Sequence, residues 1–200
     1  IQGMAEAFRV PDEDSLIYSE HGQRGYNAYT SRDLTNYQIE LPANRLEVWA
    51  RMESDRIAHS VLREFYTERD VVAEERRMRT ENIARNLLIE QYLSQVYADH
   101  PYGRPVIGPM ENIVYFDYGS AYDFYRKYYA PNNTTIALVG DLEFSSSEAL
   151  VRKYFGNLER QHIGHDSHPA PARRFLEVQL KSPGSPFLLM GWFKPALPHA

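Results

Sequence analysis

Residues 68–79 carry two carboxylates, Glu68 and Glu75, seven residues apart in a stretch with helical character. Seven residues make almost two helical turns, so the two side chains lie about 20° apart on one face. Such a face can offer a metal ion one carboxylate ligand and a supporting acid. The alternative is a solvated face whose acids pair with the neighbouring arginines, and composition by itself favours it. Glu74 points about 100° away from Glu75, so only one of the two can face a metal.

Composition limits the class of protein. The 200 residues carry a formal net charge of −5, a hydrophobic content of 43% and no cysteine. This content is ample for a globular core, and the acidic balance argues against nucleic acid as a partner. Cysteine-ligated metal and disulfides are excluded. No apolar run approaches the length of about 20 residues that a membrane-spanning helix needs, so we expect no membrane span.

Hydrophobic periodicity and turn residues predict the elements that position these acids. Helices are predicted at residues 14–21, 44–57, 63–98, 118–129 and 145–155. The second is expected to start at Asn44 as its N-cap, the third to bend near Asn82 or Asn86, and the last to be capped by Ser145 or Ser146. Strands are predicted as a pair within residues 26–41 and singly at 134–139, 175–180 and 187–193.

Five stretches, in this order along the chain, resemble motifs of the M16 metallopeptidases, the family of pitrilysin, insulin-degrading enzyme and mitochondrial processing peptidase. The stretches are Asn27-Ala-Tyr-Thr-Ser-Arg-Asp33, residues 68–79, His100-Pro-Tyr-Gly-Arg-Pro-Val-Ile-Gly108, Tyr128-Tyr-Ala-Pro-Asn-Asn133 with Val139-Gly-Asp141, and Tyr154-Phe-Gly156. Each motif is weak alone, but five in order are specific, and they cover most of residues 15–160.

The resemblance implies a fold. It is an α/β (α+β) sandwich in which helices flank a mostly antiparallel sheet, the LuxS/MPP-like metallohydrolase architecture. Residues 1–160 would form most of the metal-site domain, without its first strands and its metal helix. Residues 161–172, rich in Pro, Gly and His, would be a linker, and residues 173–200 would begin the following domain of the C-terminal type.

The resemblance also implies a zinc site. Glu75 aligns with the family's third protein ligand, and Glu68 with an acid that supports the metal. The two histidine ligands belong to a His-x-x-Glu-His motif that we expect upstream of Ile1. The implied activity is that of a zinc-dependent endopeptidase or oligopeptidase, which hydrolyses peptide bonds with metal-activated water. This chain alone is then expected to be inactive.

Asn27, Ala28 and Tyr29 resemble the family's edge strand, which binds an extended peptide as an added strand. The expected partners are a peptide or small protein substrate and a second M16 half-domain or subunit. Without the resemblance, these residues would be an ordinary strand of high β-propensity. Similarity to bacterial members further suggests a periplasmic or secreted protein.

Two other functions stay open on the sequence. One is a non-catalytic M16-like partner or scaffold subunit, in which the acids survive as salt-bridge partners. The other is a peptide-binding module without hydrolysis. His162, His165 and His168 have a spacing that can chelate a metal, but they lie in the predicted linker, and we expect adventitious binding at most.

Overall fold

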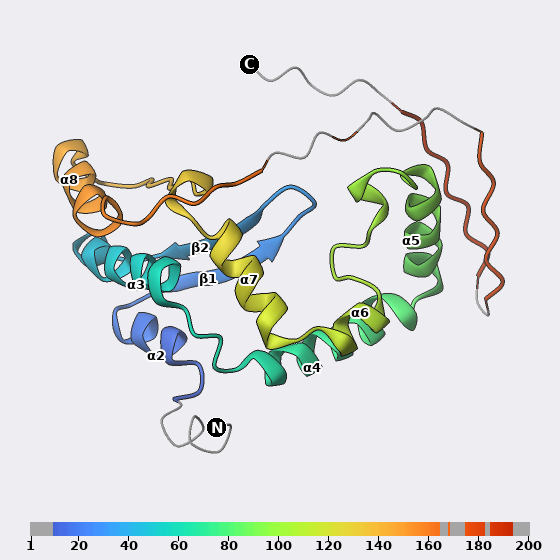
Figure 1. Cartoon of the computed structure of the whole chain (residues 1–200), viewed down its shortest axis with the longest axis horizontal. Coiled ribbons are helices and arrows are strands. Elements are labelled where there is room, and N and C mark those ends of the chain that lie inside the picture. The colour runs from blue at the N-terminus through green and yellow to red at the C-terminus, as the bar shows by residue number, and fades with distance from the viewer. Residues whose placement is uncertain (1–9, 165–167, 169–174, 183–184, 194–200) are drawn as a thin grey trace. The chain divides into compact units, whose positions relative to one another are not determined.

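The computed structural model describes residues 10–164, 168, 175–182 and 185–193 (Figure 1). The chain divides into two compact units, which we describe one at a time. The first comprises Ile1–Phe65 and Asp117–His165, and the second comprises Tyr66–Phe116 and Asp166–Ala200. Helices dominate both, and the first also contains a sheet, so the predicted mixture of helix and strand is confirmed.

In its described residues, the first unit contains a hairpin and four α-helices. In chain order its elements are α2 (Glu13–Glu20), β1 (Arg24–Thr30), β2 (Thr35–Glu40), a 3-10 turn (Ala43–Arg45), α3 (Leu46–His59), α7 (Tyr118–Tyr128), a second 3-10 turn (Pro131–Asn133) and α8 (Phe144–Phe155). The second unit contains α4 (Phe65–Arg76) except its first residue, the π-helical turn η2 (Arg77–Glu81), α5 (Ala84–Val96), a 3-10 turn (Pro101–Gly103) and α6 (Met110–Tyr115).

Strands β1 and β2 pair antiparallel, as the Tyr- and Thr-rich sequence predicts. Ser31 closes the connection, since its backbone N–H donates to the Leu34 carbonyl at 2.8 Å. The register shifts between Arg24 and Asn27, where Gly25 adopts a φ of 61°. A left-handed glycine is what a β-bulge of this kind requires. The bulge therefore lies immediately before the strand residues of functional interest.

Helix α2 ends as predicted. Gly22 has a φ of 79°, and its N–H donates to the Ser19 carbonyl at 3.1 Å, while the Gln23 N–H donates to the Tyr18 carbonyl at 3.0 Å. These two bonds form a Schellman motif, which satisfies carbonyls that the helix end leaves without partners.

Tyr125 of α7 is one of the buried residues of the first unit. Tyr125 is 8% exposed, and its hydroxyl donates to the Ile57 carbonyl at 2.6 Å and accepts from the Ser60 N–H at 3.1 Å. This hydroxyl therefore caps the end of α3. At the other face of α3, Trp49 packs on Phe155 of α8, with ring centroids 5.7 Å apart.

Three helix predictions need correction. Asn44 is not an N-cap, because Pro42 leads into a 3-10 turn and α3 begins only at Leu46. The predicted helix at 63–98 is two helices, α4 and α5, separated by η2 and an extended residue at Ile83. Helix α8 is capped by the Glu143 carboxylate rather than by a serine.

The sheet of the described residues is smaller than predicted. It has two strands, and residues 134–139 and the described parts of the C-terminal segment form no β-ladder with any other described segment. Strand hydrogen bonds come from a neighbouring strand, so apolar sequence alone does not produce a ladder. The mostly antiparallel sheet and the domain boundary at residues 161–172 stay predictions.

Candidate functional site

Helix α4 carries both predicted acids on one face, because residues 65–76 form a regular α-helix. Glu68 is exposed and, within the part of the chain that the structure describes, makes no hydrogen bond or ion pair. Glu75 lies two turns further on, and its side chain is 34% exposed. The structure thus brings these two acids onto a common helical face, with the second one closer to the core of its unit.

Two arginines of this segment pair with acids of the same segment, and these pairs bear on whether each carboxylate could bind a metal ion. Glu74 pairs with Arg77 at 2.9 Å, and both side chains are exposed. Glu75 pairs with Arg79, whose side chain is 76% exposed. An exposed ion pair of this kind contributes little free energy, about 0–1 kcal/mol. Arg79 can therefore leave Glu75 at small cost when a cation competes for that carboxylate.

Arg76 behaves differently from its neighbours. Only 6% of its side chain is exposed, and it donates to Glu90 of α5 from Nη1 at 3.1 Å and from Nη2 at 2.8 Å. It also donates from Nη1 to the Gly108 carbonyl at 2.7 Å and from Nε to Glu81 at 3.1 Å. The hydrogen bonds with Glu90 raise the pKa of Arg76 above its usual value. This clamp joins α4 to three other segments of the second unit.

Sequence reasoning missed this clamp. The sequence suggests that the arginines of residues 68–79 pair with acids of their own helix, whereas the partners of Arg76 are 5, 14 and 32 residues away. No local pattern signals such distant partners. The sequence contains one hint that Arg76 is buried. The residues four and three positions before it, Val72 and Ala73, are apolar and lie on the same side of the predicted helix.

The π-helical turn η2 begins directly after Arg76. Its signature is the bond from the Asn82 N–H to the Arg77 carbonyl, five residues back, at 3.0 Å. The Asn86 side-chain amide donates to the Arg79 carbonyl at 2.6 Å and so satisfies a carbonyl of the widened turn. Single π turns inside helical segments are frequent at functional sites. This one follows Glu75 by two residues.

The carboxylate of Glu75 on α4 is chemically suited to be one ligand of a zinc ion. A partly exposed carboxylate on a rigid helix is among the groups that bind zinc in proteins. The described residues contain no group of three or more His, Cys, Asp or Glu side chains that could hold a metal ion. Glu75 therefore supplies a suitable ligand, and a complete zinc site needs ligands beyond those described.

Asn27, Ala28 and Tyr29 lie on β1, opposite Gln38, Tyr37 and Asn36 of β2. All three are exposed, and Tyr29 keeps 51% of its surface accessible. Because the sheet of the described residues has two strands, β1 pairs along one edge only. The other edge presents backbone N–H and C=O groups that an extended peptide could pair with.

A charged cluster holds β1 in place within the first unit. Arg56 of α3 donates from Nη2 to the Tyr26 hydroxyl at 3.0 Å and pairs with Asp14 of α2 at 2.7 Å. Its Nε lies 3.3 Å from Glu53, which accepts a 2.6 Å hydrogen bond from the Tyr18 hydroxyl. Tyr18 is fully buried, and burial raises its pKa well above the usual range. We call this set, with Arg56 at its centre, the Arg56 cluster.

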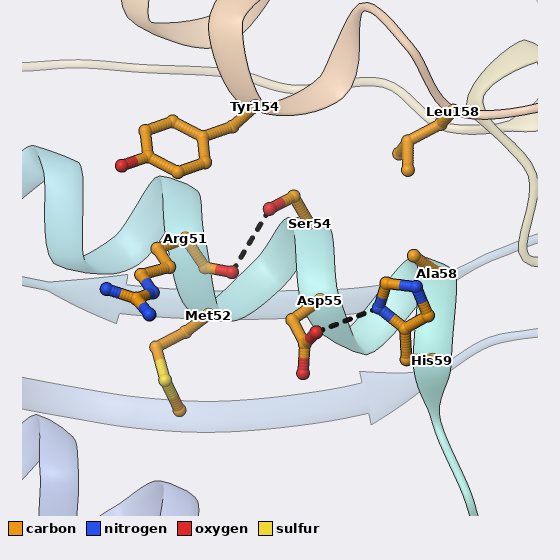
Figure 2. Close-up of a pocket in the computed structure, with 8 residues that line it drawn as sticks. All are labelled: Arg51, Met52, Ser54, Asp55, Ala58, His59, Tyr154 and Leu158. Carbon is orange, nitrogen blue, oxygen red and sulfur yellow. Dashed lines mark hydrogen bonds and ion pairs between the residues drawn. The ribbon is translucent and has the colours of Figure 1, made fainter.

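A pocket lies between α3 and the end of α8 in the first unit (Figure 2). Its volume is about 350 Å³, and its lining includes a hydrogen bond between His59 Nδ1 and Asp55 Oδ1 at 2.9 Å. Both of these side chains are about three-quarters exposed. The pocket contains none of the predicted site residues. It is a solvated groove with an exposed hydrogen bond between side chains.

Two of the histidines outside that pocket belong to helix caps. His21 is the C-terminal cap residue of α2, and His100 Nδ1 accepts a hydrogen bond from the Tyr102 N–H at 3.2 Å. Of the three linker histidines, His162 and His168 are exposed, and His165 lies outside the described residues.

Comparison with known proteins places the chain in a family. The family description "Insulinase (Peptidase family M16)" matches residues 13–110, and "Peptidase M16 inactive domain" matches residues 115–199. Together these two matches extend over nearly the whole chain. The chain belongs to peptidase family M16, which confirms the resemblance seen in its motifs.

Similar proteins support this assignment. The zinc protease PqqE of Helicobacter pylori is 33% identical over 147 residues, which are 72% of this chain and 33% of that protein. A crystal structure of a protease from Helicobacter pylori matches with a TM-score of 0.69 and 30% identity, covering 80% of this chain and 38% of that one. The ferredoxin protease FusC, solved with Arabidopsis ferredoxin, matches with a TM-score of 0.70 and 25% identity, covering 79% and 18%.

The chain spans about a third of the length of the curated relatives it matches. None of the helices among the described residues is long and apolar enough to cross a membrane.

Proposed function

We propose that the protein containing this chain is a zinc-dependent peptidase and that Glu75 is one of its metal ligands. The observation that carries the proposal is the position of Glu75: it is partly exposed on helix α4 and, among the described residues, pairs only with the exposed Arg79, in a chain of peptidase family M16. Zinc, when bound, would activate the water that attacks the peptide carbonyl. The histidine ligands of the family's site would come from outside residues 1–200, so these residues alone would be inactive.

Glu68 would support the metal without binding it. Its carboxylate lies about 20° around the helix from Glu75 and about 10 Å away along the axis, since each residue rises 1.5 Å. That separation is too large for both acids to bind one ion directly. An exposed acid on the same face can orient a ligand or accept a hydrogen bond from bound water.

Asn27, Ala28 and Tyr29 would bind a peptide or small protein substrate as an added strand along the edge of β1 that pairs with no described strand. Strand addition recognises an extended backbone before it recognises a sequence. FusC, solved in complex with ferredoxin, is a relative that acts on a protein substrate.

We further propose that a second M16 half-domain or subunit completes the enzyme, and that the extended segments at 134–139, 175–180 and 187–193 join a larger antiparallel sheet.

The test of the zinc assignment compares three glutamine variants of the full-length protein. Glu75→Gln should lose bound zinc, whereas Glu68→Gln should keep zinc and lose activity. Glu74→Gln is the matched control, because it neighbours Glu75 but points about 100° away, and it should change neither. Zinc content is measured on purified protein by elemental analysis, and peptidase activity on an unstructured peptide. Equal zinc content in wild type and Glu75→Gln would refute the assignment.

The test of strand addition uses the substrate. A series of peptides, each N-methylated at one backbone position, should show KM values that rise about 3- to 10-fold at alternate positions, because each methyl group removes one hydrogen bond of about 1 kcal/mol. A loss of affinity without this alternation would contradict strand pairing at β1.

The second candidate is a non-catalytic M16-like partner or scaffold subunit. The ion pair between Glu75 and Arg79 favours it, since it is the contact that a purely structural acid would make. This candidate predicts no bound zinc in the wild type and a normal fold in Glu75→Gln. The zinc measurement therefore decides between the peptidase and the non-catalytic subunit.

The periplasmic or secreted location is likewise a proposal, which cell fractionation tests.

A further inference from the structure

We propose that Arg76 is a positioning residue, which fixes the rotation of α4 so that Glu75 presents its carboxylate to the metal. The inference rests on the proposed function, because it takes Glu75 as a ligand. It is carried by a separate observation, namely a buried guanidinium one residue after Glu75 whose hydrogen bonds reach α5, η2 and the Gly108 carbonyl.

The geometry separates the two side chains. Consecutive residues of an α-helix point about 100° apart, so Arg76 can be buried while Glu75 stays at the surface. The residue Arg76 is 5% exposed, and the Glu75 side chain is 34% exposed. The clamp therefore holds the inner side of the last α4 turn and leaves the ligand on the outer side. Both residues belong to the second unit, and all partners of the clamp lie in that unit.

Helix α4 ends at Arg76, and the junction with the next turn is a point where the rotation of the helix has to be fixed. The turn η2 is π-helical from Arg77 to Glu81, so the regular pattern that would continue the axis of α4 into α5 is interrupted there. A helix that stops at a change of pitch can rotate about its axis more easily than one that continues. Arg76 stands at that boundary and bonds forward to Glu81, across the π turn, at 3.1 Å.

A small rotation matters to a metal ligand. A helix with its side chains has a radius of about 5–6 Å, so a rotation of about 10° moves a carboxylate by about 1 Å. Metal–ligand distances hold within about 0.2 Å of their preferred values. A last turn of α4 that rotates by even a few degrees would therefore weaken zinc binding.

The choice of arginine fits this role. Its planar guanidinium bonds Glu90 with two parallel N–H groups and still has donors for Gly108 and Glu81, which a lysine could not supply together. Apolar residues can often replace a buried ion pair without loss of stability. A buried charge with four directed bonds thus points to a requirement for orientation more than for stability.

The experiment measures the zinc dissociation constant of the full-length protein by competition with a chelator, in four variants. Arg76→Met keeps the apolar stem and removes every donor. Glu90→Gln removes one charged partner and keeps the shape. Arg77→Met is the matched control, because Arg77 is the next residue and its pair with Glu74 is exposed. Glu75→Gln reports the ligand itself. Circular dichroism checks that each variant is folded at the assay temperature.

We expect Arg76→Met to bind zinc about 10- to 100-fold more weakly, as for residues that orient ligands from behind, and Glu90→Gln to show a smaller loss. Arg77→Met should match the wild type within twofold. With zinc in excess, the KM of Arg76→Met for peptide should stay within twofold while kcat falls, a split that general destabilisation of a folded variant would not produce.

Zinc affinity within twofold of the wild type in folded Arg76→Met would overturn the positioning role. If that variant does not fold, Glu90→Gln decides by the same criterion. Loss of zinc in Glu75→Gln together with unchanged affinity in Arg76→Met would refute this inference alone. Equal affinity in wild type and Glu75→Gln would instead refute the ligand assignment of the proposed function, and the positioning role with it.

Discussion

Replacing Arg56 by methionine should loosen the first unit selectively. Methionine keeps an apolar stem of similar length and removes the hydrogen bond with Tyr26 and the ion pairs with Asp14 and Glu53. The perturbation therefore acts on charge and hydrogen bonding, with little change in packed volume. It tests whether the Arg56 cluster holds β1 against α2 and α3.

The expected cost follows from the exposure of each partner. The Glu53 side chain is 15% exposed, so losing its cation costs about 1–2 kcal/mol, and the charged hydrogen bond to Tyr26 contributes about 1.5 kcal/mol. The Asp14 side chain is 50% exposed, so its pair adds less than about 0.5 kcal/mol. The sum is about 3 kcal/mol, which corresponds to a factor of roughly 150 in an equilibrium constant.

Amide hydrogen exchange, followed by mass spectrometry, measures this cost where it occurs. Peptides from α2, β1 and α3 should lose protection by about two orders of magnitude, while peptides from α5 in the second unit serve as an internal reference. Arg51→Met is the matched control, since Arg51 is exposed on the same helix and should change protection less than about twofold. A loss below about threefold in Arg56→Met would refute the reasoning.

Two further predictions concern a cap and a close contact. Backbone N–H groups of Ser146 and Ser145 lower the pKa of Glu143 to about 2 from its usual 4.5, so the stabilisation of α8 should be complete above about pH 4.5 and disappear as pH falls through about 2. Glu143→Ala should remove this pH dependence, which amide exchange of α8 peptides measures. At Gly103 a Cβ would lie 2.4 Å from the Tyr97 carbonyl oxygen, so Gly103→Ala should destabilise the protein by about 1–3 kcal/mol in urea unfolding, whereas Gly164→Ala, with nothing within 4 Å, should cause no loss.

Local sequence signals predicted the elements whose determinants are local. The tyrosines at 118, 122, 125 and 129 repeat at helical spacing, and α7 forms there. Gly22 ends α2 in the left-handed conformation that the sequence predicts. The hairpin of β1 and β2 could likewise be predicted from the residues of its own two strands and turn.

Cap assignments failed because several residues compete for the same N–H groups. The sequence predicts Ser145 or Ser146 as the cap of α8, yet the Glu143 carboxylate accepts from both backbone N–H groups, at 2.9 and 2.6 Å, so the serines are the donors. Asn44 has the right chemistry for an N-cap, but the preceding Pro42 commits the chain to a 3-10 turn first. Residue type predicted that a cap was present and not which side chain made it.

The site could be predicted only in part. Spacing along one helix placed Glu68 and Glu75 on a common face, and the structure keeps them there. The contacts of Arg76 with Glu90 and Gly108 depend on how α4, α5 and the following loop pack, and no spacing rule reports that. Family resemblance identified the ligand candidate, whereas the group that orients it emerged from the packing.

Within the part of the chain that the structure describes, β1 pairs along one edge only, which has a consequence for handling the protein. A strand edge that could pair with a peptide could equally pair with any extended chain, including the same strand of another copy. Near Asn27–Tyr29 the strand carries no charged side chain that would repel such a neighbour, and Arg24 lies before the bulge. Concentrated preparations would thus be prone to aggregate edge to edge, and a bound peptide would act as a solubilising cover.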